Sequence, residues 1–259
     1  MWKEYAKHLV VRTPLEKPAQ QIQNLLGFKQ RMQNPELKDI YLESQIIDLI
    51  MQRLLDKSSN CIDIGCHLGS VLSLILSLSP NGHHLAFEPT PRKASWLKRK
   101  FPEVSLKEMA LSDKTGEVTF HCNTTRSGYS GLHKHGSADD QFQDITVQCE
   151  RLDNIVPAEQ HIDFIKIDVE GGELAVLRGA VDLLSRCRPT ILFECTRSGI
   201  SSFGFTLAEI FEFFTEQSYS VFIPKDFLED GKALDLEKFD KAIQYPFKAL
   251  NFIAVPEGS

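Results

Sequence analysis

The chain has 259 residues, a formal net charge of −6 at pH 7 and 42% hydrophobic residues. This composition excludes global disorder and allows one sizeable core, whereas two full-size domains would be tight in this length. The negative charge argues against nucleic acid or an anionic membrane as the main partner, because both attract basic surfaces.

The six cysteines contain no CxxC pair, which gives no support to a zinc knuckle and fits a reducing compartment. The first residues lack the apolar core of a signal peptide, and the apolar stretch Val71–Leu78 is too short to cross a membrane. We therefore expect a cytoplasmic protein without a membrane partner. Its oligomeric state is left open.

The N-terminal part of the chain is polar and contains prolines at positions 14, 18 and 35. It predicts short helical pieces joined by a loop, and Tyr41–Lys57 then shows the apolar spacing of a helix. We expect residues 1–58 to form a small helical appendage and residues 59–259 to form the main domain.

Apolar strands alternate with amphipathic helices in the rest of the chain. The predicted strands are Cys61–Ile64, His84–Phe87, Val104–Leu111, Glu117–Cys122, Ile145–Arg151, Ile162–Val169, Thr190–Cys195, Tyr219–Ile223 and Phe247–Val255. Four helices are predicted between these strands. The first follows the glycine turn and ends near Ser79, the second spans Pro91–Phe101, the third runs from Glu173 to about Ser185, and the fourth spans Leu207–Gln217. This alternation predicts a doubly wound α/β domain, in which a mostly parallel sheet is covered by helices on both faces. The long polar segment Asn123–Asp144 is expected to be a functional loop.

A glycine turn follows the first of these strands. Gly65 and Gly69 are separated by Cys66, His67 and Leu68, so the middle glycine of a dinucleotide-binding GxGxxG turn is missing. A pyrophosphate needs close approach to that middle position, whereas the methionine part of S-adenosylmethionine does not. The turn and the helix start at Ser70 are therefore expected to hold the carboxylate of S-adenosylmethionine.

Two further strand ends carry polar residues in the order that a nucleoside cofactor requires. Glu88 follows the second strand, about twenty residues after the turn, where an acid can hold ribose hydroxyls. Ser112 and Asp113 follow the third strand and are candidates for hydrogen bonds to adenine. Ligands in such folds bind outside the carboxyl ends of the strands, so these positions predict one nucleoside-type cofactor site.

The strand that ends in Lys166-Ile-Asp-Val-Glu170 carries charges within an apolar run. Lys166, Asp168 and Glu170 alternate with isoleucine and valine and are expected on one side of the strand. Such charges are costly unless they are paired or used. Asp168 is expected near the cofactor's amino group and sulfonium, while Glu170, and Glu194 at the end of the neighbouring strand, are expected near the acceptor. Lys166 pairing with one of these acids, and Glu173 stabilising a helix start, are the structural alternatives.

These motifs resemble the FkbM family of S-adenosylmethionine-dependent methyltransferases. The matching pieces include Asp63-Ile-Gly65, Phe87-Glu-Pro89, Ala110-Leu-Ser-Asp113, Ser127-Gly-Tyr-Ser-Gly-Leu132 and Ile162–Glu173. The resemblance implies a class I methyltransferase fold, a sheet with an antiparallel last strand, and O-methylation of a hydroxyl on a sugar or natural-product-like small molecule. It also implies cofactor roles for Asp63, Gly65, Gly69, Glu88 and Asp168. Where the family commonly has Ala-Asn in the glycine turn, this chain has Cys66-His67, so His67 is a candidate for the asparagine's contacts.

A hydroxyl acceptor requires a base or a metal ion. Glu170 and Glu194 are the candidate bases, and Asp168 is a further candidate catalytic residue. His133 and His135 in the long loop are the rival bases. No residue spacing specifies metal ligands, although a divalent metal is conceivable. A non-catalytic module that binds S-adenosylmethionine and an enzyme that uses NAD are the alternatives.

Overall fold

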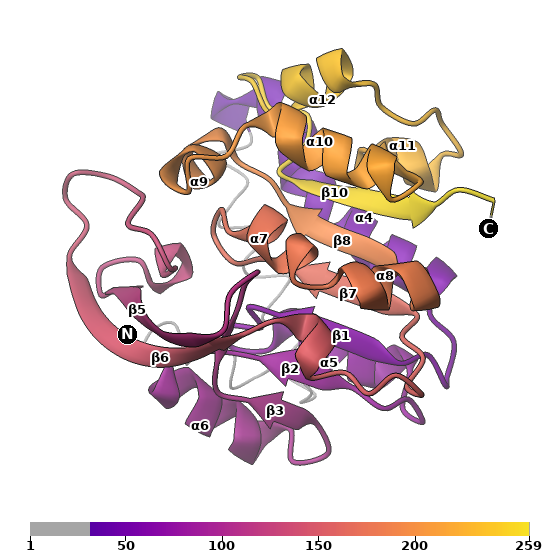
Figure 1. The fold of residues 1–259 in the computed structure, drawn as a ribbon. Coiled ribbons are helices and arrows are strands. Elements are labelled where there is room, and N and C mark those ends of the chain that lie inside the picture. Colours follow the sequence, from indigo (N-terminus) through magenta and orange to yellow (C-terminus); the bar gives the residue numbers. More distant parts are fainter. Residues whose placement is uncertain (1–31, 259) are drawn as a thin grey trace.

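The computed structural model describes residues 32–258, and the expectations for residues 1–31 lie outside this range. A seven-stranded sheet has the order β3-β2-β1-β7-β8-β10-β9 (Figure 1). Its strands are β1 (Cys61–Ile64), β2 (Leu85–Phe87), β3 (Ser105–Lys107), β7 (Phe164–Ile167), β8 (Thr190–Glu194), β9 (Tyr219–Phe222) and β10 (Asn251–Pro256). All pairings from β3 to β8 are parallel, and β10 runs antiparallel to both of its neighbours. The predicted doubly wound sheet with an antiparallel last strand is confirmed.

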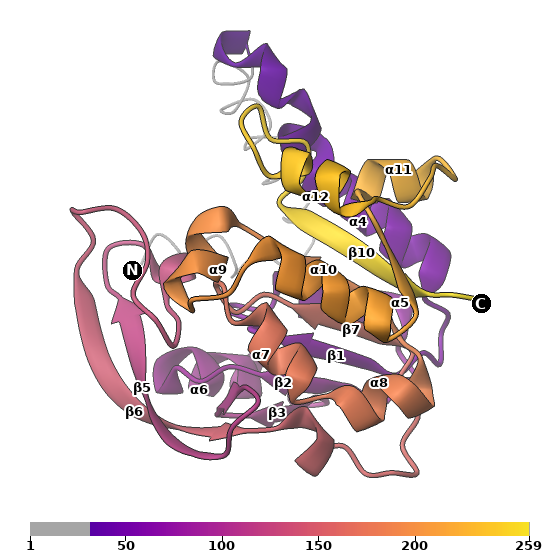
Figure 2. The same cartoon turned by 45° about the horizontal axis from the view of Figure 1, so that its top comes forward.

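Helices cover both faces of this sheet (Figures 1 and 2). The α-helices are α4 (Lys38–Leu54), α5 (Ser70–Leu78), α6 (Pro91–Lys100), α7 (Glu173–Arg178), α8 (Val181–Cys187), α9 (Arg197–Ser202), α10 (Leu207–Glu216), α11 (Pro224–Leu228) and α12 (Leu236–Ala242), and 3-10 turns lie at Pro35–Leu37, Ser127–Tyr129 and Leu152–Asn154. Alternate residues of a strand point to opposite faces of the sheet, so each face has its own hydrophobic core. Ile165 and Ile167 pack with residues of α7, α8 and α10, whereas Phe164 packs with residues of α4 and α5.

One predicted strand, Val104–Leu111, is wrong as a single element. It divides into β3 in the main sheet and β4 (Ala110–Leu111), which pairs with β6 (Phe142–Glu150) in a second sheet of order β4-β6-β5. Strand β5 (Gly116–Asn123) pairs antiparallel with β6, and the two form a long curved hairpin beyond the edge of the main sheet (Figure 1). The turn between these strands, residues 124–141, is called the β5–β6 loop below.

The predicted helix from Glu173 to about Ser185 is also divided, into α7 and α8. Gly179 lies at the break, where an added Cβ would lie 2.2 Å from the carbonyl oxygen of Ser112. The carboxylate of Asp153 accepts the amide of Leu183 at 2.9 Å and so satisfies the start of α8. The helix therefore restarts because a residue distant in sequence binds its N-terminus.

Helix α4 packs against the main sheet. Its buried Ile50 and Met51 contact the core that contains Phe164 and Ile253, and the carboxylate of its Glu43 accepts the amides of Leu250 and Asn251. The proposed division of the chain at residue 58 stays a prediction. Among the helices of residues 32–258, none has both the length and the apolarity that a bilayer-spanning segment needs.

Candidate active site

A cavity of about 320 Å³ lies at the carboxyl ends of the parallel strands. Its lining includes predicted residues from three strand ends and the glycine turn: Asp63, Gly65, His67, Ser70, Glu88, Asp168 and Glu170. The parallel order of β2, β1 and β7 brings these separate sequence motifs together, because their carboxyl ends meet at one edge of the sheet.

Gly65 permits the close approach of β1 and β7 at this edge. Its φ is +74°, and an added Cβ would lie 1.8 Å from the carbonyl oxygen of Asp168. The amides of Gly65 and Cys66 both donate to the carbonyl of Phe87, so these two donors are used inside the fold. Gly69 lies beneath the turn, where an added Cβ would meet Phe101 at 2.5 Å, and it is not among the lining residues. Gly69 therefore serves the packing of α5 against α6, and its role with the cofactor stays a prediction.

Asp63, Lys166 and Asp168 form a charge cluster at the floor of the cavity, in which Asp63 and Lys166 are buried and Asp168 is partly exposed. Asp63 lies beside Lys166 in register, and its side chain is 0% exposed. The ammonium nitrogen of Lys166 lies 3.5 Å from Asp63 Oδ1 and 3.2 Å from Asp168 Oδ2, and it donates to the Gly65 carbonyl at 3.0 Å. Burial raises the pKa of Asp63, while Lys166 lowers it. The pairing of Lys166 with acids, considered from the sequence, is present, and both Asp63 oxygens still lack a hydrogen-bond partner.

Glu88 occupies the end of β2 and is buried at the cavity wall. Its Oε1 accepts the amide of Thr90 at 2.9 Å, which fixes the carboxylate. Ser112 and Asp113 lie outside the lining residues, and the Ser112 hydroxyl donates to Asp113 at 3.1 Å. The apolar residues that precede them, Met109 to Leu111, line the cavity instead. A role for Ser112 or Asp113 with adenine stays a prediction.

The β5–β6 loop closes over the cavity from the side. His67 in the glycine turn has φ 49°, and its Nε2 lies 2.8 Å from the hydroxyl oxygen of Ser127. The buried Lys93 of α6 donates to the Ser127 carbonyl at 3.1 Å. His67 thus ties the cofactor turn to the loop, a contact that the sequence did not predict.

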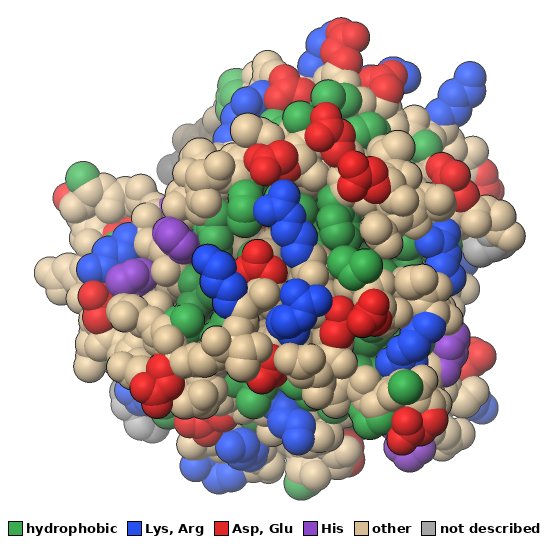
Figure 3. Space-filling model, viewed as in Figure 1, with side chains coloured by type: hydrophobic (Ala, Val, Ile, Leu, Met, Phe, Trp, Pro, Cys, Tyr) green, Lys and Arg blue, Asp and Glu red, His purple; other side chains and the backbone are tan. Residues whose placement is uncertain are grey.

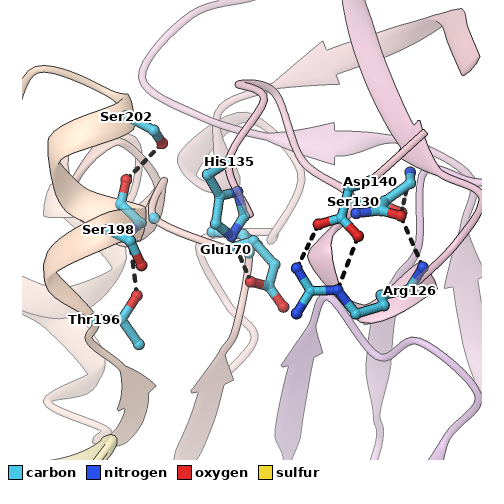
Figure 4. Close-up of polar contacts among 12 residues, drawn as sticks. Arg126, Ser130, His135, Asp140, Glu170, Thr196, Ser198 and Ser202 are labelled. Atoms are coloured by element: carbon cyan, nitrogen blue, oxygen red, sulfur yellow. Dashed lines mark hydrogen bonds and ion pairs between the residues drawn. The ribbon is translucent and has the colours of Figure 1, made fainter. Parts of the chain in front are cut away.

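A second contact joins the loop to the end of β7. His135 Nε2 and Glu170 Oε2 are 2.9 Å apart, and both residues are largely buried (Figure 4). Glu170 has φ 60°, and the following Gly171 has φ 106°. The candidate base and one of the rival histidines are therefore parts of one contact. The other histidine, His133, packs on Phe203, with ring centroids 4.2 Å apart.

Glu194 at the end of β8 lies beside these acids but is not among the residues that line the cavity. Burial and the neighbouring carboxylates raise its pKa well above the usual value. One oxygen from each of Asp168, Glu170 and Glu194 lies within 4.8 Å of the others. The chain itself already supplies a cation to Asp168, through Lys166, and a ring nitrogen to Glu170, through His135. We therefore assign no metal ligands to these carboxylates.

Glu173 holds the turn that precedes α7, a role that differs from the helix-start role considered from the sequence. Its buried Oε1 accepts the amides of Val169 at 3.0 Å and Gly171 at 3.2 Å, which holds the turn that presents Glu170. Burial raises the pKa of Glu173 to about 7.

Several lining residues carried no usable signal in the sequence. Phe203 follows α9 in a polar stretch, and Lys93 belongs to a basic helix segment typical of solvated surfaces. For Ser127, Ser130 and Leu132 the sequence did carry a signal, because they lie in the serine/glycine segment that resembles the family and within the long stretch between β5 and β6. Phe203 could not have been found, because its place depends on contact with Gly172.

Comparison with known proteins agrees with this architecture. A sequence profile for the methyltransferase FkbM domain matches residues 63–221, more than half of the chain. The chain is 29% identical over 184 residues to the 2-O-methyltransferase NoeI of Sinorhizobium fredii (strain NBRC 101917 / NGR234), an alignment that covers 64% of this chain and 73% of NoeI.

A crystal structure of methyltransferase FkbM from Methylobacillus flagellatus KT superposes with a TM-score of 0.50 at 14% identity. The match covers 78% of this chain and 44% of that one, so the chain spans less than half of that protein's length, and the likeness shows the fold alone. Because the domain profile covers residues 63–221 and the strand-end cavity lies within this range, the chain belongs to the FkbM family of S-adenosylmethionine-dependent methyltransferases.

Proposed function

We propose that this methyltransferase transfers the methyl group of S-adenosylmethionine to a hydroxyl of a sugar or glycan-like small molecule. The observation that carries the proposal is the placement of the Glu170 carboxylate in the same cavity as Asp63 and Glu88. An acid that can accept a proton thus lies beside a site suited to the cofactor. The printed activity of NoeI, 2-O-methylation, supports a hydroxyl acceptor.

The residues at the cavity floor fit S-adenosylmethionine. Asp63 has two buried oxygens without hydrogen-bond partners, which suit a cationic amino group. Glu88 has the place and chemistry to accept ribose hydroxyls, and Met109 to Leu111 offer an apolar wall to adenine. We assign Asp63, Gly65, His67, Ser70, Glu88 and Asp168 to the cofactor side of the cavity.

The bound cofactor supplies an activated methyl group on a positively charged sulfur. The chain must hold the acceptor oxygen in line with that methyl, exclude water and take up the hydroxyl proton. Glu170 lines the cavity and takes the role of proton acceptor, while Asp168 and Lys166 set the charge around it. Glu194 lies outside the lining residues, so we assign it no contact with the acceptor. Its carboxylate interacts with that of Glu170, and we propose that it acts on the electrostatics of Glu170.

The proposal is tested with methyl-labelled S-adenosylmethionine and a panel of methyl glycosides that differ in the position of their free hydroxyls. Label in a glycoside methyl ether is the expected result, and periodate mapping of the product locates the hydroxyl. Cofactor binding without transfer to any glycoside or lysate metabolite would support a non-catalytic module instead.

The contribution of a divalent cation is tested by dialysis against EDTA. We expect retention of transfer, because Lys166 and His135 already face Asp168 and Glu170. Loss of transfer that Mg²⁺ or Mn²⁺ restores would overturn this expectation and reopen the sequence's metal alternative.

A further inference from the structure

The backbone around Glu170 is fixed by hydrogen bonds and packing, but these contacts do not reach its side chain. The amides on either side of it, those of Val169 and Gly171, donate to Glu173, and an added Cβ at Gly171 would lie 2.2 Å from the Gly199 carbonyl oxygen. The turn therefore fixes the Glu170 Cα but does not fix its carboxylate. The Glu170 carboxylate is instead hydrogen-bonded by the ring of His135 (Figure 4).

The β5–β6 loop holds His135 in place. The ring of Tyr129 lies 5.6 Å from the ring of His135, and the Arg126 guanidinium lies 4.1 Å from the Tyr129 ring centroid. Arg126 is bound in turn by both carboxylate oxygens of Asp140 (Figure 4). Although the loop is polar, a chain of contacts from Asp140 to His135 orders its inner side.

The charges that face Glu170 are mainly negative. Asp168 and Glu173 lie on its own turn and Glu194 lies on β8, whereas Lys166 of β7 and His135 of the loop are the positive or proton-donating groups. Burial and Asp168 raise the pKa of Glu170, and His135 and Lys166 lower it. In the same contact, Glu170 raises the pKa of His135.

We infer that His135 is the positioning residue of the proposed base: its Nε2 holds Glu170 Oε2 and so orients the other carboxylate oxygen toward the acceptor. The inference rests on the proposed function. It extends that function because a residue of the loop, which does not line the cavity, becomes part of the proton-accepting unit. The sequence alternatives, a glutamate base or a histidine base, then become one pair.

The transfer step balances with this pair. The acceptor oxygen forms the bond to the methyl carbon as the carbon–sulfur bond breaks and leaves its electron pair on sulfur. The hydroxyl proton passes to Glu170 Oε1, and the hydrogen bond from His135 to Oε2 keeps the carboxylate aligned. No oxidant, reductant or further reactant is required.

The pair can be tested without an acceptor. ¹³C-detected titration of the glutamate carboxyls, with the Glu170 signal assigned from E170Q, gives the Glu170 pKa in the wild type, H135A and H135Q. We expect H135A to raise it and H135Q, whose amide can still donate, to restore part of the change. Titration of the His135 ring should show a lower pKa in E170Q. An unchanged Glu170 pKa in H135A would overturn the inference.

The pH profile of transfer separates positioning from a merely structural role. We expect E170Q to lose about 10²-fold or more at every pH, in the range of general base catalysis. H135A should lose activity near pH 7 and recover much of it at higher pH. Without His135 the pKa of Glu170 is higher, so its carboxyl group loses the proton only at a higher pH. A loss by the same factor at every pH would overturn the inference.

K134Q is the matched control, because it alters an exposed neighbour that pairs with Asp144 and should leave the acidic limb of the profile in place. R126A breaks the Asp140 contact that orders the loop around His135, so it should move that limb in the same direction as H135A, by a smaller amount. If no acceptor in the panel is methylated, the proposed substrate class fails, whereas the carboxyl titration still decides whether His135 controls Glu170.

Discussion

Glu173 shows how a buried acid can hold a functional turn at a cost that depends on pH. Its Oε1 accepts two amides, yet burial places its pKa at about 7. Between the ordinary pKa of glutamate and pH 7, the folded chain binds a proton that the unfolded chain has released. The stability that Glu173 gives is therefore fully present below its unfolded pKa and is lost as pH rises through about 7.

Replacement of Glu173 by glutamine should remove this dependence. The glutamine carbonyl can accept the same two amides without a buried charge, so E173Q should gain stability relative to the wild type as pH rises from about 4.5 to 7. The gain should approach about 3 kcal/mol, at 1.36 kcal/mol per unit of pKa shift. Urea unfolding at several pH values measures it, and a difference that stays constant with pH would contradict the account.

Gly65 is needed at the site for space as well as for its backbone conformation. In G65A the added carbon would collide with the Asp168 carbonyl, which should part β1 from β7 and weaken binding of S-adenosylhomocysteine measured by calorimetry. Overpacking of this kind costs about 1–3 kcal/mol. Gly116 is the control, because it also has positive φ but has nothing within 4 Å of an added Cβ. G116A should lose only about 1–2 kcal/mol of stability through strain and should bind normally.

At the scale of elements, the sequence predicted the strand ends well because apolar strands and their terminal acids follow each other locally. It could not predict where β3 stops and β4 begins, since the same side-chain pattern continues while the partner strand changes from β2 to β6. The break between α7 and α8 could not be predicted for a related reason. The cap of α8 comes from Asp153, which is distant along the chain.

Helix α4 is bound to the end of β10 by one buried acid. Glu43 accepts the amides of Leu250 and Asn251 and the side-chain amide of Asn251, all at 2.8–3.2 Å. E43A would leave these donors unpaired and should lower the free energy of unfolding by about 2–4 kcal/mol. Q45A, at an exposed position of the same helix, should change it by less than about 0.5 kcal/mol. Equal effects in denaturant unfolding would refute a special role for Glu43.

At the scale of the whole molecule, strand order assembled a site that the sequence held only as separate motifs. Asp63, Glu88, Asp168 and Glu170 were identified because each lies at or just after the carboxyl end of a strand, and parallel strands bring such positions together. The contacts of His67 with Ser127 and of His135 with Glu170 could not be predicted, because they depend on how a long loop folds back. The face covered by α7, α8 and α10 carries intermixed acidic and basic side chains, with no broad basic area (Figure 3).

A cavity built from several elements should couple cofactor binding to the stability of the whole domain. S-adenosylhomocysteine at 100 times its dissociation constant should stabilise the chain by about 2.7 kcal/mol. For a chain of this size that corresponds to a rise in Tm of roughly 5–10 °C in a thermal-shift measurement. NAD⁺ at the same concentration should produce no rise, because His67 occupies the position where a pyrophosphate site requires glycine and is bound to Ser127. Stabilisation by NAD⁺ but not by S-adenosylhomocysteine would contradict the assignment of the cavity.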